Sequence, residues 1–408
     1  MSELSYLEKL LDGVKVEWKT LDKVLKRTKG TKITAGQMKA LHKDNAPLKI
    51  FAGGKTVAFV DFKDIPEKDI NREPSIIVKS RGIIEFEYYD KPFSHKNEMW
   101  SYHSNNDAIS IKYIYYFLKI NEGYFQKIGG KMQMPQIATP DTDKFEVPIP
   151  CPDNPEKSLA IQSEIVRILD KFTALTAELT AELNMRKKQY NYYRDQLLSF
   201  KEGEVEWKTL GEIGKWYGGG TPSKNKIEFW ENGSIPWISP KDMGRTLVDS
   251  SEDYITEEAV LQSSTKLIPA NSIAIVVRSS ILDKVLPSAL IKVPATLNQD
   301  MKAVIPHENI LVKYIYHMIG SRGSDILRAA KKTGGSVASI DSKKLFSFKI
   351  PVPNINEQQR IVEILDKFDT LTNSITEGLP REIELRQKQY EYYRDLLFSF
   401  PKPETVSN

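Results

Sequence analysis

Histidines are the first residues to consider for chemistry, and their spacing in this sequence does not fit a catalytic or metal site. Ligands of a structural or catalytic metal recur at short, regular intervals. The histidines here are far apart, and a lone histidine is more often structural. They are His42, His95, His103, His307 and His317. We expect no metal site among them.

Two short motifs resemble parts of active sites. The segment GGKT, from Gly53 to Thr56, resembles the end of a phosphate-binding loop, but the first glycine of that motif would fall on Lys49. We predict a turn there. The segment PDNPEK, Pro152 to Lys157, contains carboxylates and a lysine as nuclease sites do, yet they are too close in sequence to come from separate strands around a metal. No glycine-rich cofactor-binding turn follows a predicted strand. We therefore predict a chain without catalytic activity or a cofactor of its own.

Length and composition place the chain among ordinary globular proteins. Its 408 residues suggest two or three domains, each large enough to bury a core. No stretch approaches the roughly 20 apolar residues that span a bilayer, and the N-terminus carries acids where a signal peptide has bases. Cys151 is the only cysteine, so an internal disulfide is impossible and a cytoplasmic location is expected.

Positive charge is concentrated in two blocks of the chain. Residues 22–150 carry a net charge of +5 and residues 211–350 a net charge of +4, whereas the whole chain carries +4. The rest is therefore mildly acidic. Uneven solvated surfaces would explain this pattern, but it favours a polyanionic partner.

The chain is a tandem repeat. Residues 186–200, RKKQYNYYRDQLLSF, return with four changes as RQKQYEYYRDLLFSF at 386–400. Other repeated segments are VEWKTL from Val16 and Val205, IVRILDKFTALT from Ile165 with IVEILDKFDTLT from Ile361, and FEVPIP from Phe145 with FKIPVP from Phe348. The segment from Tyr6 also resembles the segment from Tyr192. The chain thus begins inside a repeat that its end leaves unfinished, so the two termini could meet and close a ring.

The repeated segments have the periodicity of helices. Apolar residues recur every three or four positions from Ile165 to Leu183 and again from Ile361 to Leu379, and each run is followed by tyrosines and leucine. Pro380 should kink the second helix or start a new one. Two such helices running in opposite directions would pair as an antiparallel coiled coil. Most of the Tyr and Leu stripe is then expected to be core.

The blocks between the helices have a different pattern. Segments such as KTVAFVDF from Lys55 and NSIAIVVRSS from Asn271 are rich in β-branched residues and bounded by Gly, Pro and Asn, which favours strands and loops. The predicted fold class is therefore α+β: two globular mixed α/β domains separated by two long helices, in a pseudo-twofold tandem repeat. The two blocks align only at their edges.

These residues carry a resemblance to a known family. The chain resembles the specificity subunit of type I restriction-modification enzymes, in the class with TAEL repeats in the central helix, here Thr176–Leu179 and Thr180–Leu183. The marks are the IPCP and IPVP segments, the helix EQQRIVEILDKF from Glu357, and GGGTPSKNKIEFWENGSIPWISPKDM from Gly218. The first block lacks this last motif.

The resemblance implies two target recognition domains that each recognise one half of a split double-stranded DNA sequence. It also implies that catalysis belongs to partners: two modification (methyltransferase) subunits that use S-adenosylmethionine, and restriction subunits (translocase and endonuclease) that use ATP and Mg. The implied divisions are an N-terminal segment 1–21 that completes the circular repeat, a recognition domain 22–150, a central helical region 151–204, a second recognition domain 205–350 and a C-terminal helical region 351–408.

The family's chemistry then selects candidate residues. Polar side chains on loops should contact bases while nearby cations contact phosphates. In the second block the candidates are Thr221, Ser223, Lys224, Lys241, Arg278, Ser279, Asn298, Gln299, Lys331, Lys332, Thr333 and Ser336. In the first block they are Lys55, Lys79, Arg81, Lys96, Tyr102, Lys131, Gln133 and Gln136. The candidate contacts to partner subunits are Tyr190, Tyr193, Arg194, Tyr390, Tyr393 and Arg394.

Two other functions stay open. A two-domain scaffold that binds proteins and no DNA would share the repeats, but it would not bind random duplex with a steep salt dependence. A self-sufficient DNA methyltransferase would transfer methyl groups as an isolated chain, which we do not expect.

Overall fold

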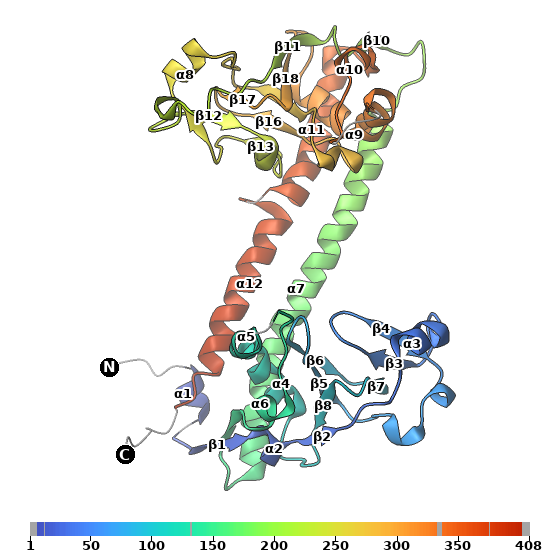
Figure 1. The fold of residues 1–408 in the computed structure, drawn as a ribbon, viewed down its shortest axis with the longest axis vertical. Helices are drawn as coiled ribbons and strands as arrows, with labels where there is room; N and C mark the ends of the chain where they lie inside the picture. Colours follow the sequence, from blue (N-terminus) through green and yellow to red (C-terminus); the bar gives the residue numbers. More distant parts are fainter. Residues whose placement is uncertain (1–5, 12, 131–132, 333–336, 375, 402–408) are drawn as a thin grey trace. The chain divides into compact units, whose positions relative to one another are not determined.

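The computed structural model describes residues 6–11, 13–130, 133–332, 337–374 and 376–401. They form two compact units (Figure 1). The first unit is Met1–Thr176 with Arg386–Asn408, and the second unit is Ala177–Leu385. Each has its own buried core and combines helices with β-sheets, so the α+β prediction is confirmed.

The first unit contains a four-stranded antiparallel main sheet. In sheet order its strands are β2 (Lys26–Thr28), β8 (Trp100–His103), β5 (Ser75–Lys79) and β6 (Glu85–Tyr89). The helices are α2 (Leu21–Val24), α4 (Ile111–Ile120), α5 (Glu122–Gly129) and α6 (Thr139–Asp143). Helix α4 contacts β5 and β6, and its apolar face is buried in the core through Tyr113 and Phe117.

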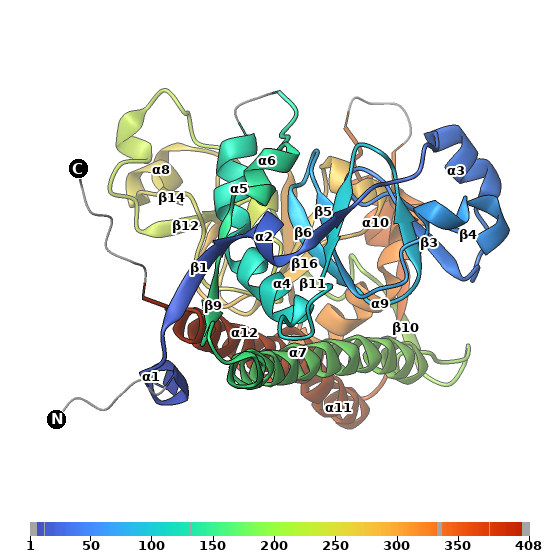
Figure 2. The ribbon, with the colours of Figure 1, turned by 90° about the horizontal axis from the view of Figure 1, so that it is seen from below.

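A smaller three-stranded sheet completes this domain. Its central strand β3 (Leu48–Phe51) pairs antiparallel with β4 (Val57–Val60) and parallel with β7 (Phe93–His95). Helix α3 (Ala35–Leu41) covers it with Met38, and Figure 2 shows this small sheet on the side of the main sheet away from α5. Short helical turns follow β4 at Phe62–Asp64 and Glu67–Asp69.

The second unit contains the same two kinds of sheet. The main sheet, in order, is β11 (Gly214–Gly218), β18 (Met301–Pro306), β15 (Ser272–Val276), β16 (Ser288–Ile291) and β13 (Leu247–Val248). In the small sheet, β12 (Ile235–Ile238) pairs antiparallel with β14 (Tyr254–Ile255) and parallel with β17 (Thr296–Leu297). The helices are α8 (Glu257–Gln262), α9 (Val312–Ala330) and α10 (Ser342–Ser347), with short turns at Ile227–Phe229, Pro240–Asp242 and Ser280–Asp283.

The strands of the two units correspond one to one along the chain. Strands β2, β3, β4, β5, β6, β7 and β8 of the first unit take the positions of β11, β12, β14, β15, β16, β17 and β18 of the second. Only β13 has no counterpart among the described strands. The two blocks, which align only at their edges in sequence, therefore share one topology.

A two-strand ladder closes each domain. In the first unit β1 (Val16–Thr20) pairs with β9 (Glu146–Pro150), placing Trp18 opposite Pro148. In the second, β10 (Glu206–Thr209) pairs with β19 (Lys349–Val352), placing Trp207 opposite Pro351. The repeated VEWKTL and proline-rich segments are thus partners in the same structural element.

Long helices carry the repeated apolar stripes. Helix α7 (Pro155–Leu197) is continuous through both TAEL segments, whereas its counterpart is divided into α11 (Ile355–Asn373) and α12 (Gly378–Leu397). Pro380 lies in the first turn of α12, so the prediction of a fresh helix is confirmed. In the first unit, α7 and the end of α12 are antiparallel, because Phe172 contacts Tyr393 while Ile168 lies with Leu397. The long helices fit the predicted coiled coil.

The first and last described helices share one core in the first unit. Helix α1 (Tyr6–Leu11) buries Leu7 and Leu11 in the same core cluster as Leu397 and Phe398. The predicted meeting of the termini falls on residues 1–5 and 402–408, which lie outside the described residues, but the neighbouring helices α1 and α12 contribute to the same core.

Candidate nucleic-acid interface

In the second unit, three strand ends meet at one edge. The loop after β11 approaches the end of β17, where the Gly220 amide donates to the Leu297 carbonyl at 2.8 Å. Next to this bond, the Thr221 hydroxyl donates to Oε1 of Gln299 at 2.8 Å. Both side chains were predicted from sequence to contact DNA, and the structure brings them together from positions 78 residues apart.

The close approach of the loop after β11 to the loop after β17 requires glycine. A Cβ atom at Gly219 would lie 1.7 Å from the Asn298 carbonyl oxygen, and one at Gly220 would lie 2.9 Å from the Thr265 amide nitrogen. Any side chain at Gly219 would push the two loops apart. Gly219 and Gly220 of the triple-glycine motif therefore allow Thr221 to lie against Gln299.

Arg278, at the end of β15, borders the same loop. Its amide donates to the Asp300 carbonyl at 3.2 Å, and its Nε lies 3.9 Å from the Asp300 carboxylate. A β-bridge joins Arg278 to Ser339. The guanidinium side chain stays 59% exposed, so it can donate hydrogen bonds outward. We call Gly220–Thr221, Asn298–Asp300 and Arg278 with Ser339 the second edge.

The other candidates of this unit lie on its surface or beyond the described residues. Lys331 pairs with Asp283 at 2.6 Å and Lys241 lies 4.0 Å from Glu252, both in exposed ion pairs that are easily exchanged for other anions. Ser223, Lys224 and Lys332 are exposed, and Ser279 is half-buried as the cap of a short helical turn. Thr333 and Ser336 lie outside the described residues.

The first unit builds an edge from the corresponding strands. Nε and Nη2 of Arg81 donate to Oε1 of Gln136 at 3.2 and 3.0 Å, and a β-bridge joins the two residues. Lys96, directly after β7, pairs with Glu98 at 2.6 Å. The Ser80 hydroxyl donates to the Glu98 carbonyl at 3.0 Å, which ties this loop to the end of β5. We call Thr31–Lys32, Lys96–Glu98 and Ser80–Arg81 with Gln136 the first edge.

Of the remaining candidates in this unit, two are exposed. Lys55 lies on the turn between β3 and β4, which confirms the turn predicted for GGKT, and Gln133 is exposed beyond α5. Lys131 lies outside the described residues.

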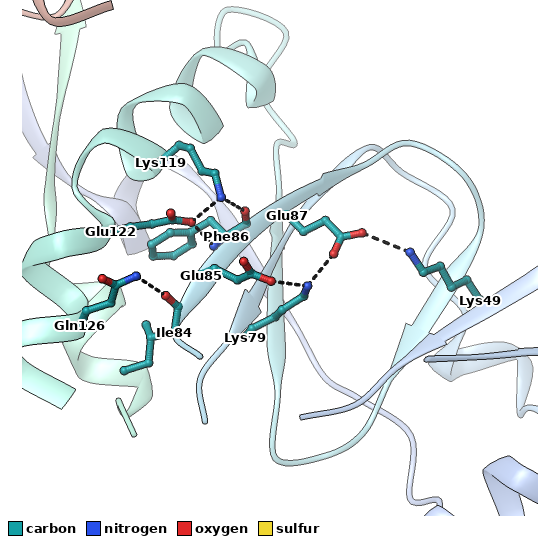
Figure 3. A network of polar contacts seen from close by, with 9 residues as sticks. All are labelled: Lys49, Lys79, Ile84, Glu85, Phe86, Glu87, Lys119, Glu122 and Gln126. Carbon is teal, nitrogen blue, oxygen red and sulfur yellow. Dashed lines mark hydrogen bonds and ion pairs between the residues drawn. The ribbon is translucent and has the colours of Figure 1, made fainter. Parts of the chain in front are cut away.

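Lys79 is not the exposed cation that we expected. Its side chain is 9% exposed, and Nζ lies 2.6 Å from Glu85 and 2.8 Å from Glu87. Glu87 also pairs with Lys49, so a chain of charges links the main sheet to the small one (Figure 3). Desolvation would lower the pKa of Lys79, but hydrogen bonds to the two glutamates outweigh it and raise that pKa. Lys79 is an internal ion-pair partner, and its prediction as a DNA contact is withdrawn.

Tyr102 is likewise internal. It is fully buried, and its hydroxyl donates to Oδ1 of Asp143 at 2.5 Å and lies 2.7 Å from the Thr142 hydroxyl. Burial raises its pKa. Its position on central strand β8 explains the error, because alternate residues of such a strand face the core.

The predicted partner contacts in the second unit, Tyr190, Tyr193 and Arg194, all contact neighbouring side chains. The Tyr190 hydroxyl lies 3.1 Å from Nδ1 of His317, and the Tyr193 ring stacks on Phe368. Arg194 covers the Tyr190 ring at 5.6 Å and pairs with Asp195 at 3.1 Å. Tyr190 is thus mostly packing, as expected for the stripe.

The first unit repeats these contacts. Arg394 covers the Tyr390 ring at 5.7 Å and pairs with Asp395 at 2.7 Å, while Tyr393 stacks on Phe172. Sequence reasoning missed the most open aromatics of both helices, Tyr192 at 62% and Tyr392 at 65% exposed. Their place beside the stripe in the repeated QYxYYRD segment was the available signal.

The described residues form no candidate metal site. No three or more His, Cys, Asp or Glu residues among them form a group that could hold a metal ion. His95 is buried, which lowers its pKa, and His317 is buried between Tyr190 and Asp366. None of the described helices is long and apolar enough to cross a membrane. The fold therefore defines a protein with two α/β units of one topology, each with an edge of polar and basic side chains, and with long helices that carry the repeated apolar stripes.

Comparison with known proteins identifies the family. Residues 15–186 and 202–385 match the type I restriction modification DNA specificity domain. The chain belongs to this family and is a specificity subunit of a type I restriction-modification system, the component that recognises the DNA target. It is 73% identical to the Escherichia coli type I restriction enzyme EcoR124I/EcoR124II specificity subunit over 100% of both chains. It is also 37% identical to the Escherichia coli EcoprrI specificity subunit, covering 92% of this chain and 93% of that one.

Solved structures show the same fold at low sequence identity. The S subunit of a type I restriction-modification system from M. genitalium matches with a TM-score of 0.60 and 18% identity, over 96% of this chain and 98% of that one. A chain from a study of complex assembly and conformational transition in the type I R-M system matches with a TM-score of 0.54 and 13% identity, over 94% and 97%.

Proposed function

We propose that the chain recognises a bipartite DNA target, with one edge in each unit contacting one half-site. The observation that carries this proposal is the repetition of a single edge geometry on two divergent sequences. Each edge joins three strand ends and presents an arginine, Arg81 or Arg278, beside exposed amide, hydroxyl or ammonium groups. Such groups suit hydrogen bonds to base edges and phosphates.

The proposed DNA contacts are the candidates that the structure leaves at these edges or on the surface near them. They are Lys55, Arg81, Lys96, Gln133, Gln136, Thr221, Ser223, Lys224, Lys241, Arg278, Ser279, Asn298, Gln299, Lys331 and Lys332. The net positive charge of both blocks supports a polyanionic partner.

The chain is proposed to act without catalysis of its own, in the cytoplasm. Two modification subunits supply methyl transfer with S-adenosylmethionine, and restriction subunits supply ATP- and Mg-dependent translocation and cleavage. They dock on the long helices. The strong similarity to relatives named as specificity subunits of restriction enzymes supports this division of labour.

The experiment compares DNA binding and methylated sequence in one preparation. The full chain, assembled with its modification subunits, should bind random duplex with an affinity that falls steeply with salt, because phosphate contacts release counterions. Sequencing methylated adenines in a host that carries this assembly should yield two short defined half-sites separated by an undefined spacer. A protein-interaction scaffold would give neither result, and a single continuous methylated sequence would contradict recognition by two edges.

A further inference from the structure

Matching hydrogen bonds place the two edges in register residue by residue. The Thr31 amide donates to the His95 carbonyl at 2.7 Å, as the Gly220 amide donates to the Leu297 carbonyl at 2.8 Å. Thr31 therefore corresponds to Gly220. The next residue along the chain, Lys32, corresponds to Thr221.

The second loop of each edge has the same internal bonds. The Lys96 amide donates to the carbonyl of Phe51, the last residue of β3. The Asn298 amide likewise donates to the carbonyl of Ile238, the last residue of β12. In the first unit a hydrogen bond from the Met99 amide to the Lys96 carbonyl, 3.0 Å long, closes the turn. In the second unit the Met301 amide donates to the Asn298 carbonyl at 3.1 Å in the same way. Loops of equal length place Asn97 at the position of Gln299.

The arginines correspond by the same criterion. In the first unit, the Ile137 amide donates to the Ser80 carbonyl at 3.0 Å and the Gly82 amide donates to the Pro135 carbonyl at 2.9 Å. Arg81 lies between Ser80 and Gly82. In the second unit, the Ile340 amide donates to the Val277 carbonyl at 2.8 Å and the Ser279 amide donates to the Ala338 carbonyl at 3.0 Å. Arg278 lies between Val277 and Ser279. Each edge thus keeps a common arginine while its other two positions differ.

We propose, on the basis of the proposed function, that Lys32 contacts the first half-site and helps to determine its sequence, as Thr221 does for the second. Lys32 is exposed on the first edge. A lysine donates to guanine O6 and N7, whereas a threonine can donate or accept through its hydroxyl and contact a thymine methyl with its own methyl group. Different residues at one position of one scaffold would give the two edges different base preferences.

Asn97 is the positioning residue for Lys32. With its amide oriented to satisfy its neighbours, Nδ2 of Asn97 donates to the carbonyls of Gly30, at 2.8 Å, and Thr31, at 3.3 Å. It therefore holds the loop that carries Lys32, as Gln299 holds Thr221 through their hydrogen bond.

The test exchanges the two side chains in the full chain assembled with its modification subunits. Lys32→Thr should reduce discrimination at one base pair of the first half-site about tenfold or change the preferred base there, and leave the second half-site unchanged. Thr221→Lys should alter only the second. Lys63→Thr is the matched control, because Lys63 follows β4 at the end of the small sheet opposite to the edge. The readout is the methylated sequence of each variant.

The outcomes separate this inference from the proposed function. If Thr221→Lys changes its half-site and Lys32→Thr changes nothing, the correspondence is wrong while bipartite recognition stands. If both variants alter both half-sites, recognition by separate edges is wrong. If Lys32→Thr abolishes methylation, binding of the mapped duplex by the variant assembly decides: loss of specific binding with retained random binding supports the contact, and failure to assemble overturns it.

Three variants test Asn97. Asn97→Asp keeps the shape but removes both donors, so it should reduce discrimination in the first half-site as Asn97→Ala does. Asn97→Gln, which restores an amide, should recover part of it. An Asn97→Asp assembly with unaltered half-sites would remove Asn97 from the inference.

Discussion

The ring of Phe172 stacks on the ring of Tyr393, with centroids 5.5 Å apart and planes inclined by 25°. Tyr193 and Phe368 make the same contact in the second unit, at 5.6 Å and 25°. Each pair joins one copy of the ILDKF segment to one copy of the QYxYYRD segment. The repeats in sequence are therefore the two sides of a duplicated contact.

The exposed tyrosines beside these stacks are expected to bind modification subunits. Tyr192→Ala with Tyr392→Ala should weaken assembly by roughly 1–2 kcal/mol per site, because exposed aromatic side chains at an interface carry much of its binding energy. Random-duplex binding should change little. Pull-down of the modification subunit and DNA titration measure the two effects. Tyr124→Ala, an exposed tyrosine on α5, is the control.

Charge reversal of Arg194 with Arg394 should also weaken assembly more than DNA binding. The guanidinium of each arginine lies over the ring of Tyr190 or Tyr390. Replacing it with an acidic side chain therefore also removes this contact with the ring. A variant that assembles normally but binds DNA poorly would place both arginines at a different interface.

Domain exchange tests whether the units recognise DNA separately. Replacing residues 22–150 by the corresponding block of a relative should change one half-site and leave the other as it was, because this block and the second recognition block have separate cores. The methylated sequence is the measurement. Simultaneous change of both half-sites would contradict separate recognition.

Sequence alone revealed the scaffold better than the edges. Apolar spacing and Pro380 were sufficient for the long helices and the start of α12, since helix periodicity is a local property. The edges depend on strand pairing over long separations, as between Thr221 and Gln299, which local pattern does not encode. Lys79 was mistaken for a surface cation because nothing near it in sequence shows that β5 turns it toward Glu87.

The Lys79 network predicts a pH-dependent stability. Hydrogen bonds from Lys79 and Lys49 outweigh desolvation and hold the pKa of Glu87 below 4.5, while the pKa of Lys79 is raised above 10.5. The stability from Glu87 is present above pH 4.5 and is lost as the pH falls through its folded pKa. The stability from Lys79 is present below pH 10.5 and is lost as the pH rises through its folded pKa.

Lys79→Met should therefore destabilise the first unit by about 2 kcal/mol at neutral pH, because it leaves two glutamates with fewer partners. The difference from wild type should shrink in acid below about pH 4.5. Hydrogen exchange at amides of β5 and β6 reports this unit, and Lys63→Met provides the control. A difference independent of pH would mean that the charges contribute nothing and that only packing was lost.

The last prediction concerns the TAEL segments, Thr176–Leu179 and Thr180–Leu183, which begin where α7 passes from the first unit to the second. A third copy lengthens this helix by about 6 Å and rotates the downstream residues by roughly 40°, since four residues slightly exceed one turn. The apolar stripe nearly keeps its face, so the chain should fold and recognise both half-sites. One base pair advances DNA by about 3.4 Å. An oblique crossing or elastic yielding reduces the shift, and we expect a spacer longer by one base pair. Mapping methylated sites for the two-copy and three-copy chains measures it; an unchanged spacer would show that this helix does not set the distance.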